Sequence, residues 1–159
     1  MRRLSVALGL GFAVLMFAAI ASAAAPTKES NTFSDTFVDT DTCPGVTING
    51  SFTETDTIIT FSATSVQIHV SEVVQLNANG KTVIDNDHFT IMLDPTTTVN
   101  KYVGTVFNIQ APGVGNLLLD AGNEIFDFST DPPTIIFLAG PHPAFLGDIA
   151  AFCAYLADP

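Results

Sequence analysis

The sequence predicts an all-β protein, built as an antiparallel up-and-down β-barrel of about eight strands with a short C-terminal helix. Three observations lead to this prediction. Apolar and polar residues alternate with a period of two through most of the chain, which is typical of strands with one buried and one wet face. Turn-forming residues separate the alternating segments, and Thr, Val, Ile and Phe dominate within them. A β-sandwich is the alternative arrangement of the same strands.

The alternation defines the expected strands in chain order. The segments are 32–39, 46–54, 57–62, 64–76, 81–84, 88–94, 97–110, 116–128 and 134–139. Asn79-Gly80, between two apolar runs, is the strongest hairpin signal in the chain. Within 116–128 the apolar residues change from odd to even positions, and a bulge at Gly122 would restore the phase. Closure of these sequential strands into a barrel would leave no exposed sheet edge.

Only the C-terminal segment has a helical pattern. Gly140 to Pro143 end the last expected strand, and Asp148 is expected to cap or open the helix that follows. The apolar stripe of this helix consists of Ile149, Phe152, Cys153 and Leu156.

The first residues have the composition of a cleavable export signal. Arg2 and Arg3 form a positive start, 4–20 carry no charge, and Ala21-Ser22-Ala23 is a small-residue cleavage sequence. A retained membrane anchor is the rival interpretation, because the uncharged run is near the length of a span. The small residues at its end favour cleavage near Ala23 and secretion. The expected organisation is a signal peptide at 1–23, a flexible N-terminal tail at 24–31 and a single β domain at 32–159.

The chain is strongly acidic, with a net charge of −11. Because both arginines lie in the expected signal peptide, cleavage leaves three lysines against sixteen acids, which is a net charge of −13. Phosphate backbones and anionic headgroups repel such a chain, and no arginine remains to bind them. The sequence therefore predicts no nucleic-acid partner and, after cleavage, no stable membrane anchor.

Two cysteines, Cys43 and Cys153, lie near opposite ends of the exported chain. An even pair of distant cysteines in an exported protein is typical of a disulfide. Their separation of 110 positions would make the bridge worth roughly 4–5 kcal/mol in a chain-entropy treatment. The spacing suggests no third ligand for a metal–thiolate site.

The three histidines belong to no catalytic or metal-binding motif. His69 falls on the wet face of its expected strand, His88 begins a strand, and His142 lies between two prolines in a loop. Neither the H-x-H nor the H-E-x-x-H spacing occurs, so all three are expected to be solvated polar side chains. The sequence thus predicts no metal site, no cofactor and no catalytic residue.

Two acidic segments resemble calcium loops only superficially. Asp39-Thr40-Asp41 and Asp85-Asn86-Asp87-His88 do not continue into the spacing of an EF-hand. Asx-turns between strands account for the same residues without an ion. No G-x-S-x-G sequence is present to indicate a serine nucleophile.

Phenylalanine supplies most of the expected interior. Eleven of the thirteen phenylalanines lie beyond the signal peptide, most of them within expected strands. An eight-stranded barrel is just wide enough to be filled by side chains or to hold one small apolar ligand. Filling by side chains is the default, because protein interiors are close-packed, and a ligand cavity is the alternative.

Several short motifs together resemble a group of small exported bacterial proteins that have no assigned activity. The motifs are Phe33-x-x-x-Phe37, Val46-x-Ile48-x-Gly50-x-Phe52-Thr53, Asn79-Gly80-Lys81, Leu117-Leu118-Leu119-Asp120-Ala121-Gly122, Gly140-Pro141-His142 and Ala150-Ala151-Phe152-Cys153. The resemblance implies an exported bacterial protein with a disulfide between its N- and C-terminal regions. It brings no catalytic residues.

Three functions are consistent with these features. The first is a secreted, non-catalytic domain that binds a small apolar ligand in its interior or a partner on its surface. The second is an extracellular isomerase, cyclase or hydrolase with a site in the barrel mouth. Such a site requires a polar cluster inside, for which His69 or His88 with an aspartate are the best candidates. The third is a structural component of the cell surface.

Overall fold

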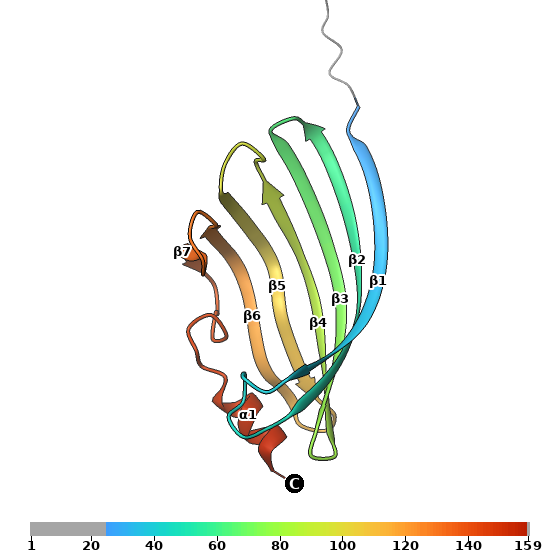
Figure 1. Ribbon diagram of the computed structural model, residues 1–159, viewed down its shortest axis with the longest axis vertical. Helices are drawn as coiled ribbons and strands as arrows, with labels where there is room; N and C mark the ends of the chain where they lie inside the picture. The colour runs from blue at the N-terminus through green and yellow to red at the C-terminus, as the bar shows by residue number, and fades with distance from the viewer. Residues whose placement is uncertain (1–24, 159) are drawn as a thin grey trace, which may run out of the picture.

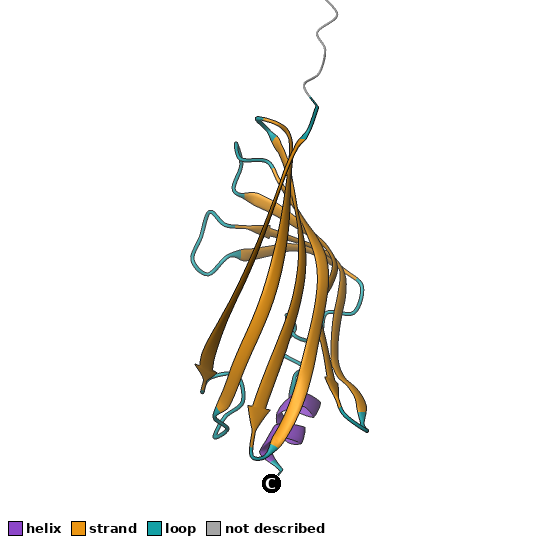
Figure 2. Cartoon of the chain, turned by 90° about the vertical axis from the view of Figure 1, so that its right-hand side faces the viewer, coloured by secondary structure: helices purple, strands orange, loops and turns teal. Residues whose placement is uncertain are grey.

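The computed structural model describes residues 25–158, which form one antiparallel sheet in sequential strand order and one short helix. The elements are β1 (Thr27–Asp39), β2 (Ile48–Ser62), β3 (Ser65–Ala78), β4 (Lys81–Leu93), β5 (Val99–Ala111), β6 (Gly115–Asp127), β7 (Thr134–Ala139) and α1 (Ala150–Ala157). Figure 1 shows the strands side by side with α1 at one end, and Figure 2 shows the twist of the sheet. The predicted all-β fold with a C-terminal helix is confirmed. The expected signal peptide lies outside the described residues.

The sheet is open, so the predicted closed barrel of about eight strands is wrong. Among the described residues, β1 pairs only with β2, and β7 pairs only with β6. The expected segments 46–54 and 57–62 are continuous in β2, and 81–84 and 88–94 are continuous in β4, which leaves seven strands. β7 has only six residues, whereas each other strand has at least 13. β7 therefore pairs with only the Asn123–Asp127 part of β6, and among the described residues it does not pair with β1.

β1 begins earlier than the sequence indicated. Residues 27–31, predicted as part of a flexible tail, are paired with β2 from Thr27↔Thr60 onward. Hydroxyl groups join the two strands on one face: Ser34 and Thr53 lie 2.8 Å apart, and Thr32 and Thr55 lie 2.9 Å apart. Cross-strand hydroxyl pairs of this kind stabilise antiparallel strands. The polar composition that suggested a tail instead forms the wet face of an edge strand.

The Asn79-Gly80 hairpin is confirmed. Ala78 pairs directly with Lys81, and both turn residues have positive φ angles, of 50° and 77°, as a type I′ turn requires. The bulge predicted at Gly122 is absent, because Gly122 pairs in register with Gly104. The even-numbered residues of β6 face inward without a change of phase, since Leu118, Asp120 and Glu124 are all buried. The sequence pattern misled because two of these inward residues are acids.

The main apolar core lies where α1 packs against the sheet. Phe152 and Leu156 of α1 are buried with strand residues that include Ile48 and Val83. The predicted disulfide joins Cys43 to Cys153, with 5.3 Å between the Cα atoms, and so ties α1 to the loop after β1. Asp148 does not cap the helix: Ile149 occupies the N-cap position, and no side chain caps it. No helix within residues 25–158 is long and apolar enough to span a membrane.

Candidate functional site

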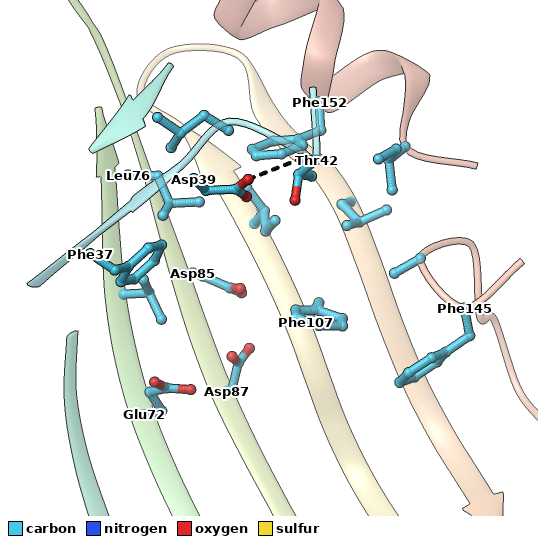
Figure 3. Close-up of a pocket in the computed structure, with 16 residues that line it drawn as sticks. Phe37, Asp39, Thr42, Glu72, Leu76, Asp85, Asp87, Phe107, Phe145 and Phe152 are labelled. Atoms are coloured by element: carbon cyan, nitrogen blue, oxygen red, sulfur yellow. Dashed lines mark hydrogen bonds between the residues drawn. The ribbon is translucent and has the colours of Figure 1, made fainter. Parts of the chain in front are cut away.

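A cleft of about 500 Å³ opens on the inner face of the sheet, next to the apolar core. Its apolar wall comes from the strands and from the end of the chain, with Val74, Leu76, Ile109, Leu118 and Phe152. Three further aromatic side chains face it from separate segments: Phe37 on β1, Phe107 on β5 and Phe145 in the loop before α1 (Figure 3). The Phe107 and Phe145 rings lie 6.1 Å apart. The cleft thus offers an aromatic and aliphatic surface to a bound molecule.

Phe37 reaches the cleft because it crosses Gly50. The two residues are paired across β1 and β2, and a Cβ atom on Gly50 would lie 2.2 Å from Cζ of Phe37. Any side chain at position 50 would therefore displace the ring. A glycine that exposes backbone for an aromatic neighbour is a known device in sheets.

Carboxyl groups form a line across the polar side of the cleft. Glu54 of β2 pairs with Glu72 of β3, and Glu72 pairs with Asp87 of β4. Asp85 lies two residues before Asp87, on the same face of β4. We call these four residues the carboxyl row; Figure 3 shows Glu72, Asp85 and Asp87 against the cleft. Like charges directly opposite each other destabilise a sheet, so this arrangement opposes folding.

Two members of the row are buried, the other two are half-buried, and the row lacks a counter-ion. Asp85 and Asp87 are only 4% and 2% exposed. Oδ1 of Asp85 accepts a hydrogen bond of 2.6 Å from the backbone N–H of Asn108, but Oδ1 of Asp87 has no hydrogen-bond partner. Among residues 25–158, the ion pairs involve only Lys81 with Asp158 and His142 with its two acids. The cleft therefore has a buried acceptor and an excess of acid that no described side chain neutralises.

Burial raises the pKa values of acids in the carboxyl row, so these groups keep their protons to a higher pH. Burial and the neighbouring Asp85 carboxyl raise the pKa of Asp87 to about 9. Burial and the nearby Asp56 raise the pKa of Glu54 to about 7. Burial, assisted by the charges of Asp85 and Asp56, also raises the pKa of Glu72. A pKa of about 9 favours the protonated carboxylic acid form of Asp87 at neutral pH.

These shifts set the expected dependence of stability on pH. A carboxyl with a raised pKa keeps its proton in the folded chain where the unfolded chain has lost it. The free energy of unfolding therefore falls as pH rises from about 4 to the folded-state pKa, which is about 9 for Asp87. Thermal denaturation in EDTA should give a higher Tm at pH 5 than at pH 9.

Asp87→Asn should reduce this fall and stabilise the chain at pH 9 by roughly 1–3 kcal/mol, because it removes a buried charge among Glu54, Glu72 and Asp85. The matched control is Glu29→Gln, which changes an exposed acid on β1. A wild-type Tm that rises steadily from pH 5 to pH 9 would contradict the burial of the row.

A second polar cluster lies on β6 and the loop after β7. Asp120, Glu124 and His142 are 0%, 1% and 3% exposed. Nδ1 of His142 is 2.7 Å from Oδ1 of Asp120, with which it forms a hydrogen bond, and 3.2 Å from Oε1 of Glu124. The second Asp120 oxygen accepts the backbone N–H of Ala144 at 3.1 Å. We call Asp120, Glu124 and His142 together the His142 cluster.

Two glycines allow this loop to approach β6 so closely. Gly122 and Gly140 have φ angles of +141° and +126°, which other residues rarely adopt. A Cβ on Gly122 would lie 2.1 Å from the Ala139 oxygen, and one on Gly140 would lie 2.2 Å from the Ala121 oxygen. The backbone N–H of Ala121 donates a 2.9 Å hydrogen bond to the oxygen of Pro141. This crossing directs the next residue, His142, toward Asp120.

The charges in the His142 cluster are partly balanced. Burial acts to lower the pKa of His142. The hydrogen bond to Asp120, the Ala139 carbonyl and the two acid charges raise this pKa by more than burial lowers it, so the net shift is upward. Burial and the charge of Asp120 raise the pKa of Glu124 to about 7, against the opposing effect of His142. Neither oxygen of Glu124 has a hydrogen bond, because its 3.2 Å approach to His142 lacks the required geometry.

The structure separates the three predicted histidine positions. His69 is exposed as expected and lies 2.9 Å from Oγ1 of Thr90, and His88 is exposed as well. The enzyme hypothesis expected His69 or His88 in an interior polar cluster, and the structure places His142 in such a cluster instead. His142 was predicted to be solvated, but it is buried. Its flanking prolines indicated a loop, and they gave no sign that the loop turns inward.

The two acidic segments that were compared with calcium loops differ in structure: one forms a turn and the other lies in a strand. Oδ1 of Asp39 accepts hydrogen bonds from the backbone N–H groups of Asp41 and Thr42, at 2.8 and 3.0 Å, so the predicted Asx-turn is confirmed there. The hydrogen bonds with Thr42 lower the pKa of Asp39. Asp85 and Asp87, however, lie within β4 and point into the cleft. Sequence reasoning misses them as site residues because closely spaced acids and asparagine are also typical of turns.

Among the described residues, one group brings histidine and carboxylate atoms close enough to hold a metal ion: the ligand atoms of Asp120, Glu124 and His142 all lie within 4.8 Å of one another. The carboxyl row and the His142 cluster thus place acids on β2, β3, β4 and β6 of one sheet. Comparison with protein-family models, curated proteins and solved structures found no match, so the function must be argued from this geometry.

Proposed function

We propose that this chain is an exported, non-catalytic binding protein whose cleft holds a small molecule with an apolar body and a cationic head group. The apolar body would lie against the aliphatic and aromatic wall, and a protonated amine would meet the carboxyl row. This proposal keeps the small apolar ligand expected from the sequence and adds a charged group to it. The cleft lies on an open sheet rather than inside a closed barrel.

One observation carries the proposal: buried acids line an apolar cleft without a described counter-ion. Charged groups are seldom buried without a partner, because desolvation of an unpaired carboxylate costs several kcal/mol. Asp87 has an unpartnered oxygen on the cleft wall. An ammonium group would supply both the charge and the hydrogen-bond donors that the row lacks.

The aromatic side chains support a cation in the same place. Phe37, Phe107 and Phe145 line the cleft together with three members of the row, Glu72, Asp85 and Asp87. The face of an aromatic ring attracts an ammonium group, and the attraction increases where water is excluded. A volume of about 500 Å³ is within the range of small-molecule sites. The net negative charge of the chain would also concentrate cations near the cleft.

Export is supported by two features. The Cys43–Cys153 disulfide fits a protein that folds in an oxidising compartment. The first 23 residues have the composition of a signal peptide.

A matched set of eight-carbon probes tests the proposal. Octylamine, octanol and octanoate share one apolar body and differ in the charge of the head group. In calorimetric titrations at pH 9, where Asp87 with a pKa of about 9 is partly ionised, we expect octylamine to bind roughly tenfold more tightly than octanol, because one charge-assisted contact is worth about 1.4 kcal/mol or more. Octanoate should bind most weakly, because the row repels it.

A double variant, Glu72→Gln with Asp87→Asn, should abolish the preference for octylamine while leaving octanol binding unchanged. Removal of repelling acids favours folding, so this variant should remain folded. Glu29→Gln is the control for a general loss of negative charge. Equal binding of all three probes would contradict the cationic head group, and no binding of any of them would contradict the proposal as a whole.

A further inference from the structure

The His142 cluster contains an unusual polar residue. Glu124 is 1% exposed, and neither of its carboxyl oxygens has a hydrogen-bond partner. Buried carboxyl oxygens are nearly always hydrogen-bonded or bound to a cation, so an orphaned pair indicates a missing partner. Nε2 of His142, which is equally buried, also has no hydrogen bond of acceptable geometry. The hydrogen bond between Asp120 and His142 therefore does not satisfy the whole cluster.

The positions of the three side chains match what a metal ion needs. Nδ1 of His142 faces both carboxylates, at 2.7 Å from Asp120 and 3.2 Å from Glu124. When each ligand atom lies about 2.0–2.2 Å from a tetrahedral ion, the ligand atoms are separated from one another by distances similar to these two or slightly longer. The donors come from two elements that the Gly122–Gly140 crossing holds together. Only small movements would open the Asp120–His142 hydrogen bond for an ion.

We propose that Asp120, Glu124 and His142 bind one divalent transition-metal ion, with Zn²⁺ as the best fit to the donors. One imidazole nitrogen and two carboxylates are suitable Zn²⁺ ligands and leave a fourth position for water. The second oxygen of Asp120 is already held by the N–H of Ala144, which is the kind of outer contact that orients a metal ligand. The sequence predicted no metal site because its ligands, D-x-x-x-E and a distant histidine, form no recognised motif.

The ion would act on the cleft through the loop that carries His142. Phe145 lies three residues after His142, and its ring is 6.3 Å from the imidazole. Phe145 also lines the cleft and contacts Phe126 with 5.4 Å between ring centroids. An ion bound to both β6 and this loop would fix one wall of the cleft. Metal binding is thus a structural clamp in this proposal and does not depend on the identity of the cleft ligand.

The test uses the chain as secreted by an expression host, without a histidine tag and after treatment with EDTA. Equilibrium dialysis against Zn²⁺ should retain one ion per chain, and Zn²⁺ should raise the Tm. Glu124→Gln preserves the side-chain volume and the Asp120–His142 hydrogen bond, and it should weaken Zn²⁺ binding at least tenfold. Asp127→Asn, on the same strand but away from the cluster, and His88→Gln, at an exposed histidine, should bind Zn²⁺ like the wild type.

Co²⁺ added to the wild-type chain provides a measurement that does not depend on a variant. A four-coordinate site should give intense visible absorption that Zn²⁺ removes. A weak spectrum like that of hydrated Co²⁺ would overturn the proposal. So would the absence of a retained ion, or retention that Glu124→Gln leaves unchanged. In those cases the side chains of the His142 cluster are held together only by their hydrogen bond and ion-pair contacts, without a metal ion.

Discussion

Replacing Cys43 and Cys153 together by serine is expected to lower the free energy of unfolding by about 4–5 kcal/mol. The bridge closes a loop of 110 residues, and nearly the whole sheet lies within that loop. Its loss restores conformational freedom mainly to the unfolded chain. Since small domains are stable by only about 5–15 kcal/mol, such a loss approaches the total. Urea denaturation of the two proteins, monitored by circular dichroism, measures the difference.

The remaining contacts of α1 show why the helix should separate before the sheet unfolds. Without the bridge, α1 is held by the burial of Phe152 and Leu156 and by two hydrogen bonds from the β3–β4 hairpin. Those bonds run from Asn79 to the oxygen of Leu156, at 2.9 Å, and from Lys81 to the oxygen of Tyr155, at 3.0 Å. Hydrogen exchange in the double serine variant should therefore be fastest in α1. A variant within 1 kcal/mol of the oxidised wild type would contradict this assignment.

Asp120→Ala is expected to destabilise the metal-free chain by about 3–5 kcal/mol, because it breaks a buried pair by removing one partner. The substitution leaves His142 and the N–H of Ala144 buried without the acceptors that now lie 2.7 and 3.1 Å away. The loop that carries Phe145 should then detach from β6. Urea denaturation in EDTA measures the loss, and hydrogen exchange at the Ala144 amide should rise.

Two further variants distinguish the charge from the shape of Asp120. Asp120→Asn keeps the volume and one acceptor, so its loss should be smaller than that of Asp120→Ala. Asp127→Ala removes a partly exposed acid of β6 whose carboxylate accepts a 2.7 Å hydrogen bond from Thr98, and it should cost less than about 1 kcal/mol. Equal effects of Asp120→Ala and Asp127→Ala would show that the His142 cluster does not hold the loop.

Much of the strand order could be predicted because it depends on local patterns. Alternation of apolar and polar residues located the strands, with 134–139 matching β7 at both ends. Asn79-Gly80 identified its hairpin through the φ angles that the turn demands. The disulfide followed from the presence of only two cysteines in a chain whose first residues have the composition of an export signal. Each of these inferences needed only neighbouring residues or a count.

Closure of the sheet could not be predicted in the same way. Whether β1 meets β7 depends on strand lengths, stagger and twist summed over the whole sheet. β7 has only six residues, and the chain then turns back through Gly140 and His142 instead of forming a further strand. In addition, Glu54 and Asp56 interrupt the apolar alternation of β2, which made one strand look like two.

The candidate site was missed for a single physical reason. Alternation assigns apolar residues to the inside and acids to the outside, yet Asp85, Asp87, Asp120 and Glu124 all face inward. A register shift between Thr105 and Phe107 also changes the inward phase of β5, so Phe107 and Val103 lie on opposite faces although their spacing suggests one face. Exceptions to a local rule tend to mark functional sites, where stability is sacrificed to binding. The signal available in the sequence was the pair of acids at alternate positions in an otherwise apolar strand.

The cationic ligand is tested most directly by side-chain carboxyl NMR of ¹³C-labelled protein at pH 7, with and without octylamine. We expect the Asp87 carboxyl signal to move from its protonated to its ionised position as the amine binds. The methyl signals of Ile109 and Leu118, on the apolar wall of the cleft, should shift at the same amine concentrations. An Asp87 signal that stays protonated at saturating octylamine, or shifts confined to the outer face of the sheet, would contradict the assignment.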